Sequence, residues 1–316
     1  MTRAVRTVCG DIEPARLGTC DAHDHVFLTS AALPGHELTD PRAAEAELRA
    51  FAEAGGASVV QWSPFGTGRG GDWLAELSRS TGVHLVAATG LHQARHYRPD
   101  TIPEEPAQLF VDELVHGMRL DGPPGAPPTR ARAGLIKVAG SFHGLDEHAR
   151  WTMTEAAAAH HATGAPIAVH HEQGTAALDV LDLLCGHLDV PPASVILGHL
   201  NRRPDPREQL AAARSGAFLA FDGPSRAHHA TDWRLMDTLV ALAEAGHADQ
   251  LMVGADTTTA EARAATGEGP GMPYLLRTLR PRLERELGTE ITNRIFVDNP
   301  ARALATEWRA PVTSPG

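Results

Sequence analysis

The stretch PIAVHHEQGTAALDVLDLLCGHLDVPPASVILGHL (166–200) decides the fold class, because it holds a complete unit of strand, helix and strand. Its ends, PIAVHHE (166–172) and SVILGHL (194–200), are short and almost continuously apolar, which is typical of strands buried on both faces. The segment between them, TAALDVLDLLCGHLD (175–189), has the longer amphipathic pattern of a helix. This order predicts two parallel strands joined by a helix.

The same unit repeats along the chain, which contains eight such apolar runs. They are TCDAHDHVF (19–27), ASVVQWSPF (57–65), VHLVAATGL (83–91), AGLIKVAGS (133–141), PIAVHHE (166–172), SVILGHL (194–200), GAFLAFDGP (216–224) and QLMVGAD (250–256). Eight strand-then-helix units favour an α/β fold of the (β/α)₈ TIM-barrel type. The alternative, an open doubly wound sheet, would need a G-x-G-x-x-G phosphate loop after an early strand, and GTGRGG (66–71) only approaches that form.

We expect one domain over residues 1–308 and a flexible tail over 309–316. The N-terminal residues VRTVCGDIEPARLG (5–18) predict a small strand and turn that close the barrel floor. The Pro- and Gly-rich stretch DGPPGAPPTR (121–130) predicts an exposed connection away from the active mouth. Residues 256–273 predict a long, flexible loop that acts as a lid or selects the substrate.

Composition and charge exclude several classes of partner. The formal net charge is -11, with 39 acidic against 28 basic residues, whereas nucleic acids and anionic membranes require a basic face. No apolar stretch approaches the roughly 20 residues that span a bilayer, and the N-terminus lacks a signal-peptide pattern. The odd set Cys9, Cys20 and Cys185 predicts neither a disulfide framework nor a zinc ribbon, so we expect a cytoplasmic protein.

Histidines mark the first predicted strand as a candidate metal site. His23 and His25 are two residues apart on a strand, so their side chains share a face while Asp24 points to the other. Two imidazoles side by side at a barrel mouth can bind one metal ion. The alternative is a chance H-x-H pair, since the chain contains 18 histidines.

Three more strand ends carry metal-ligand side chains. The fifth, sixth and eighth runs end with His170, His199 and Asp256. The carboxyl ends of barrel strands meet at one mouth, where such folds place their chemistry. Four strand ends then supply ligands that zinc, manganese or cobalt accept, so we predict a divalent metal site.

The fourth run buries Lys137 within GLIKVAG (134–140), where an unpaired ammonium would be costly. A desolvated lysine that loses its proton can react with carbon dioxide. The resulting carbamate is an anionic ligand whose two oxygens can bridge two metals. The alternative is an ion pair between Lys137 and an Asp or Glu inside the barrel.

These residues together resemble the phosphotriesterase family of the amidohydrolase superfamily. The resemblance rests on the H-x-H strand, IKVA, PIAVH, LGH and GAD, together with VAATGL (86–91) and VDNPAR (297–302), and covers nearly the whole chain. It implies a homodimeric hydrolase with two divalent metals. The more buried metal would be held by His23, His25 and Asp256, the more exposed one by His170 and His199, and N6-carboxylated Lys137 and a hydroxide would bridge them.

Such a site predicts hydrolysis of ester bonds. Two cations lower the pKa of a shared water, and the exposed metal polarises the oxygen of the bond under attack. Asp256 is then the expected proton acceptor, which passes the proton to the leaving group. We therefore expect Asp256 and Lys137 to be the catalytic residues.

The loops favour a lactone substrate. FDGPSR (221–226) and GLHQARHY (90–97) resemble the branch of the family that opens sugar-type lactones, including phosphorylated ones. That branch binds the phosphate with basic and tyrosine residues after the barrel aspartate, whereas this chain reads DTTTAEA (256–262) and has His228 where a lysine is expected. We therefore expect a neutral or hydroxylated lactone. The candidate contacts are His92, Gln93, Arg226 and His228, each of which could instead be a solvated loop residue.

Two other functions remain open. An organophosphate triesterase would need an apolar, aromatic pocket, to which Trp62, Phe65 and Trp233 could contribute although aromatic residues make up only 5% of the chain. An inactive metal-binding scaffold would be expected to lack the proton acceptor or the bridging lysine. This chain has both Asp256 and Lys137.

Overall fold

The computed structural model describes residues 2–120, 127–223 and 231–310. Its centre is one eight-stranded parallel sheet in which strands adjacent in sequence are also neighbours in space. The strands are β3 (Cys20–Asp24), β4 (Ser58–Gln61), β5 (His84–Gly90), β6 (Leu135–Ala139), β7 (Ile167–His170), β8 (Val195–Gly198), β9 (Phe218–Asp222) and β10 (Leu251–Gly254). All eight lie within the runs expected to form strands.

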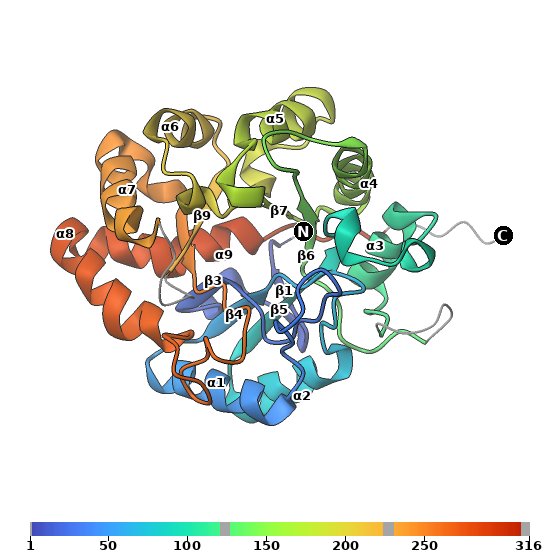
Figure 1. The fold of residues 1–316 in the computed structure, drawn as a ribbon, viewed down its shortest axis with the longest axis horizontal. Helices are drawn as coiled ribbons and strands as arrows, with labels where there is room; N and C mark the ends of the chain where they lie inside the picture. Colours follow the sequence, from blue (N-terminus) through green and yellow to red (C-terminus); the bar gives the residue numbers. More distant parts are fainter. Residues whose placement is uncertain (1, 121–126, 224–230, 311–316) are drawn as a thin grey trace.

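Helices surround the strands as an outer ring (Figure 1). They are α1 (Pro41–Glu53), α2 (Gly71–Thr81), α3 (Pro106–Val115), α4 (Glu147–Thr163), α5 (Ala177–Leu181), α6 (Pro206–Arg214), α7 (Leu235–Leu242), α8 (Arg280–Asn293) and α9 (Asn299–Leu304). Capping explains several boundaries: α4 begins where the Asp146 side chain accepts a hydrogen bond from Ala149 N–H and ends at the left-handed Gly164. Among the described residues, no helix is long and apolar enough to cross a bilayer.

The first and last strands of the sheet meet and close the barrel. The backbone N–H of Asp256 donates to the carbonyl of His23 at 2.9 Å, just beyond the end of β10. Gly254 lies so close to β3 that a Cβ atom there would come within 2.5 Å of the His23 backbone. The predicted (β/α)₈ barrel is therefore confirmed, and the open-sheet alternative is wrong.

Buried apolar side chains form two layers. Inside the barrel, Val86, Ala168 and Ala220 pack together with Trp62. Between the strands and the helices lies a larger layer that includes Phe221 and other residues at alternate strand positions. Both faces of the strands are buried, which explains why the runs are apolar without a polar alternation.

A short hairpin covers the amino-terminal end of the barrel, as expected. Strands β1 (Val5–Thr7) and β2 (Gly10–Ile12) pair antiparallel. Val8 N–H donates to Leu85 O at 2.9 Å, at the start of β5. The hairpin therefore closes the end opposite to the one where the metal-ligand candidates lie.

The structure describes only part of the expected exposed connection (121–130) and of the expected C-terminal tail (309–316). Residues 121–126 of the expected exposed connection and residues 311–316 of the expected tail lie outside the described residues. Arg309, which we expected in the flexible tail, is held at α4, since its backbone N–H donates to Thr163 O at 2.9 Å.

The loop over residues 256–273 is irregular and is hydrogen-bonded to the rest of the barrel, while its flexibility and its role as a lid or in substrate selection stay predictions. The buried Glu47 of α1 accepts hydrogen bonds from Ala265 N–H at 2.8 Å and Met272 N–H at 2.9 Å. Arg263 is 2% exposed and donates to Val26 O at 2.6 Å. Three hydrogen bonds between residues distant in sequence therefore connect this loop to α1 and to the segment after β3.

Candidate metal centre

The carboxyl ends of the strands bring the six predicted ligands together. His23 lies in β3, Lys137 lies in β6, His170 ends β7, and His199 and Asp256 follow β8 and β10. Together with His25, these side chains line one cavity of about 230 Å³ at the barrel mouth. The prediction that these residues share one mouth agrees with the structure.

Their separations allow shared coordination. The rings of His23 and His199 are 4.7 Å apart between centroids, and those of His170 and His199 are 4.4 Å apart. Asp256 Oδ1 lies 3.5 Å from His25 Nε2 and 3.7 Å from His23 Nε2. One ligand atom each from His23, His199 and Asp256 lies within 4.8 Å of the others, as in a group that could hold a metal ion.

Two of these residues adopt a backbone conformation that side chains rarely take. His199 has φ 62° and Asp256 has φ 53°, both in the left-handed region. Such a residue costs on the order of 1–3 kcal/mol and persists where the surroundings fix it, commonly at functional sites. Both side chains line the cavity at the barrel mouth.

Burial keeps most of the imidazoles neutral, which is the form that binds metals. Burial lowers the pKa of His23 to about 4, and it also lowers the pKa of His25 and, further, that of His170. His199 differs: burial opposes its charge, but Asp222 and Asp256 raise its pKa. The donor set of nitrogen and oxygen atoms fits a zinc-type cation.

Lys137 is buried at 2% exposure and points into the cavity. Its ammonium makes no ion pair within 4.0 Å among the described residues, so the alternative of a lysine paired with Asp or Glu is not supported. Burial lowers the pKa of Lys137 to about 7, against the opposing charge of Asp256. An amine that is neutral near neutral pH is the form that reacts with carbon dioxide.

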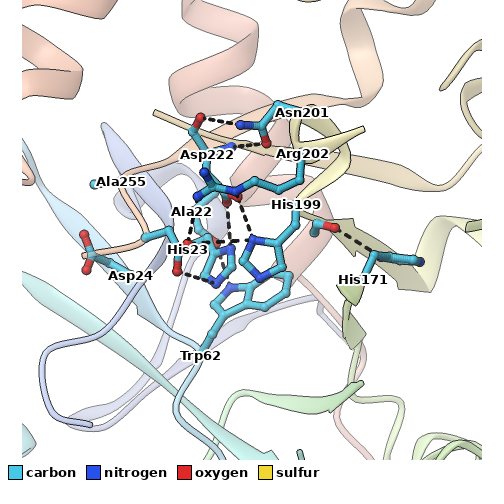
Figure 2. A network of polar contacts seen from close by, with 12 residues as sticks. Ala22, His23, Asp24, Trp62, His171, His199, Asn201, Arg202, Asp222 and Ala255 are labelled. Carbon is cyan, nitrogen blue, oxygen red and sulfur yellow. Dashed lines mark hydrogen bonds and ion pairs between the residues drawn. The ribbon is translucent and has the colours of Figure 1, made fainter. Parts of the chain in front are cut away.

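Asp222, which the sequence analysis overlooked, links two of the histidines (Figure 2). It ends β9 and is completely buried. His199 Nδ1–H donates to its Oδ2 at 2.6 Å, and His23 Nδ1 lies 3.1 Å from its Oδ1. The carboxylate therefore turns the Nε2 atom of each ring toward the cavity. The available signal was the aspartate at the end of the seventh run.

Two more side chains position the first histidine pair. Ser63 Oγ donates to Phe27 O at 2.5 Å and so accepts from His25 Nδ1–H at 2.8 Å, which leaves His25 Nε2 free. Trp62 stacks on His23 with ring centroids 3.9 Å apart and donates its indole N–H to Ala22 O at 2.9 Å. Figure 2 shows Trp62 packed against the His23 ring.

Glu172, also overlooked, holds the exposed side of His170. Its Oε2 lies 3.4 Å from His170 Nε2 and accepts hydrogen bonds from Arg95 at 2.8 Å and from Gln93 at 3.1 Å. Gln93 also donates to Gly140 O at 2.7 Å. The amide N–H groups of Gln93 therefore donate to other groups of the protein. A contact between Gln93 and the substrate stays a prediction.

Arg202, which was also not predicted from the sequence, joins two carboxylates. Its Nη2 donates to Asp256 Oδ2 at 3.2 Å, and its Nε lies 3.5 Å from Asp222 Oδ2. The side chain is only 9% exposed but lines the cavity. Asp256 thus presents Oδ1 to the histidines and Oδ2 to a guanidinium.

Other predicted positions vary in their outcome. His92 lines the cavity, and its ring lies 4.6 Å from that of His170. Arg226 and His228 lie outside the described residues. As expected, Asp24 turns away, and its Oδ1 accepts from Thr257 N–H at 3.0 Å. His171 donates its Nδ1–H to Gly198 O at 3.1 Å and is completely buried, although it is among the residues that line the cavity.

The aromatic pocket considered for organophosphates does not form around this cavity. Trp62 is completely buried beneath His23, and Trp233 is 71% exposed. Neither of them, nor Phe65, is among the described residues that line the cavity. Within the described part of the chain, these three side chains therefore do not form walls of the cavity.

Known proteins are similar to this chain in sequence and in fold. The chain is 29% identical to a phospho-furanose lactonase of Mycoplasmopsis synoviae over 95% of this chain and 91% of that protein. The crystal structure of a lactonase from Listeria monocytogenes superposes with a TM-score of 0.87 at 27% identity, covering 96% and 99% of the two chains. A mutant organophosphorus hydrolase from Deinococcus radiodurans gives a TM-score of 0.81 at 26% identity, covering 96% and 97%.

The sequence profile of the phosphotriesterase family matches residues 3–304, which include every candidate ligand. Because this match spans the whole barrel and its mouth, the chain belongs to the phosphotriesterase family.

Proposed function

We propose that this protein is a metal-dependent hydrolase of ester bonds whose substrate is a lactone. The observation that carries the proposal is the convergence of four histidines, one buried lysine and one aspartate on a single cavity at the barrel mouth. Membership of the family and the lactonase relatives support the same activity.

The residues fit two divalent cations. His23, His25 and Asp256 would hold the more buried ion, His170 and His199 the more exposed one, and carboxylated Lys137 would bridge them. When bound, two such cations lower the pKa of a shared water and polarise the carbonyl oxygen of the substrate. Zinc is the proposed metal, with manganese or cobalt as alternatives.

The protein's own groups would orient and move the proton. Asp256 has an oxygen beside the histidines and is the proposed proton acceptor, which returns the proton to the alkoxide of the opened ring. Arg202 restrains the other oxygen at 3.2 Å, so the carboxylate cannot rotate freely. Asp222, Ser63 and Glu172 orient the histidines.

The cavity favours a small, polar substrate. Its volume of about 230 Å³ is below the range of roughly 300–1,000 Å³ for sites that enclose drug-sized ligands. Polar and charged side chains form much of the described lining, with Leu28, Leu33 and Pro64 as apolar members. A neutral or hydroxylated lactone fits this wall better than a dialkyl aryl phosphate, although the same activated water could attack phosphorus.

The test is hydrolysis by metal-loaded protein of γ- and δ-lactones, sugar lactones with and without a phosphate, acyl-homoserine lactones, aryl esters and a dialkyl aryl phosphate. We expect chelator-sensitive lactone opening with little turnover of the phosphate triester. Dominant triester hydrolysis would reverse the order of the two activities. A folded, metal-loaded protein inert on the whole panel would favour the non-catalytic scaffold.

Three further properties belong to the same proposal. The protein would be a homodimer, as the family resemblance implies, with residues 1–308 as one domain. It would act in the cytoplasm, which agrees with three cysteines that form no disulfide.

A further inference from the structure

A second cavity lies at the opposite end of the barrel from the metal-ligand candidates. It has a volume of about 590 Å³ and is enclosed by the turn of the β1–β2 hairpin, α2 and the segment before β6. Gly134, which follows that segment, lies so close to the hairpin that a Cβ there would come within 2.2 Å of Arg6 O. We call this cavity the floor cleft; none of the candidate metal ligands lines it.

The floor cleft concentrates positive charge in an acidic protein. Arg79, Arg130 and Arg132 line it, and no Asp or Glu is among its described lining residues. Neither Arg79 nor Arg130 makes an ion pair among the described residues, whereas Arg132 Nη2 lies 3.0 Å from Asp11 Oδ1. The chain as a whole carries a formal charge of -11. The floor cleft, with three guanidinium groups, therefore has the opposite sign of charge to the chain as a whole.

Asp11, the carboxylate that pairs with Arg132, is already bound to a second arginine. Arg6 binds Asp11 with two parallel hydrogen bonds of 2.8 Å, and Arg6 is itself buried at 5% exposure. Asp11 thus faces two guanidinium groups and cannot neutralise both. Burial and the charge of Arg6 lower the pKa of Arg132, as expected where positive charge is in excess.

We infer that the floor cleft binds a small molecule that carries a phosphate-type oxyanion. Guanidinium groups bind such oxyanions with paired hydrogen bonds, and three of them around one hollow favour more than one negative charge. The volume exceeds what a single inorganic ion needs and suits a phosphorylated metabolite. A nucleic acid is disfavoured because the rest of the surface is acidic. This inference does not depend on the proposed lactonase activity.

A thiol inside the cleft provides a local readout. Cys9 is exposed, lines the cleft and lies 4.0 Å from Arg79 Nη1. The other two thiols react poorly because burial raises the pKa of Cys20 to about 12 and that of Cys185 to about 11. Alkylation of Cys9 by the uncharged reagent iodoacetamide therefore reports on the cleft alone, even if phosphate also binds at the barrel mouth.

The experiment measures the rate of Cys9 alkylation in the metal-loaded protein by peptide mass spectrometry. Inorganic phosphate or glycerol 3-phosphate is added at constant ionic strength, balanced with chloride. We expect saturable protection; at ten times the dissociation constant the rate should fall about tenfold, because only the unliganded fraction reacts. Stronger protection by glycerol 3-phosphate would identify an organic phosphate as the ligand, and equal protection would identify the phosphate group alone.

Variants separate a specific site from general charge effects. Arg79→Gln and Arg130→Gln should each lose most of the protection, measured as the ratio of rates with and without phosphate. The matched control Arg98→Gln removes an arginine that is 79% exposed in the loop after β5 and should keep the protection. Absence of saturable protection, equal protection by chloride, or unchanged protection in both cleft variants would overturn the inference.

Discussion

Replacing Asp222 by Asn should weaken metal binding without removing any proposed ligand. The buried carboxylate accepts from His199 Nδ1–H at 2.6 Å with one oxygen and faces His23 Nδ1 at 3.1 Å with the other. An amide of the same size has one acceptor oxygen and one N–H₂ donor. In the variant, either His23 or His199 therefore no longer has an acceptor for its Nδ1–H. That ring instead faces the amide N–H₂, which favours the tautomer with the proton on Nε2.

The magnitude follows from the number of rings affected. Loss of the outer partner of a metal-binding histidine typically weakens metal affinity or activity about 10- to 100-fold. At about 1.4 kcal/mol for each tenfold change, this corresponds to roughly 1.4–2.8 kcal/mol. Because one carboxylate serves both His23 and His199, we expect Asp222→Asn to fall near the upper end, about 100-fold in metal affinity.

The assay is metal retention against a competing chelator, with metal content measured by mass spectrometry and turnover measured on the best lactone. Asp24→Asn is the matched control: Asp24 is equally buried and adjacent to the same histidines, but it bonds Thr257 and the His25 backbone rather than an imidazole. It should retain metal within about threefold, since an amide oxygen can accept the same N–H groups. The reasoning is refuted if Asp222→Asn binds metal as tightly as the parent protein.

Three further substitutions test the other roles. Asp256→Asn should leave the fold intact and lower turnover at least about 100-fold, the usual contribution of a positioned proton acceptor; unchanged kcat would exclude that role. Lys137→Ala should lose metal and activity, with partial recovery on addition of formate or acetate, and a variant that keeps its full metal content would exclude a bridging carbamate. Glu172→Gln should weaken retention of one metal equivalent by about tenfold, because Glu172 orients His170, and Glu172→Asp should recover part of the loss; equal retention in all three proteins would contradict this.

The strands and the ligand positions could be predicted because their signals are local. A strand buried on both faces is apolar throughout, and a polar residue at its end stands out against that background. The same rule that identified His170, His199 and Asp256 could have identified Asp222, since the seventh run ends with it. Asp222 differs from Asp256 in not lining the cavity, and the sequence pattern alone does not reveal that it contacts two imidazoles.

The anchored loop and the other overlooked residues depend on contacts distant in sequence. Glu47 fixes the loop over residues 256–273 from α1, more than 200 residues earlier, and Arg202 reaches Asp256 from the loop after β8. Composition alone describes that loop as small and polar, which is also the composition of a mobile segment. Only the closed barrel brings the partners together, so these contacts could not be predicted from the local sequence.

Register explains why two strand-end aspartates on adjacent strands have different roles. Asp222 pairs with Gly254 in the ladder between β9 and β10, so Asp256 stands two residues nearer the mouth. At about 3.3 Å per residue this separates the two backbone positions by roughly 6–7 Å. Asp222 consequently lies behind the imidazoles, with no exposure, and can only orient them, whereas Asp256 is 8% exposed and lines the cavity. A sequence pattern marks both as strand ends; the stagger of the closed barrel decides which one can meet a metal and a substrate.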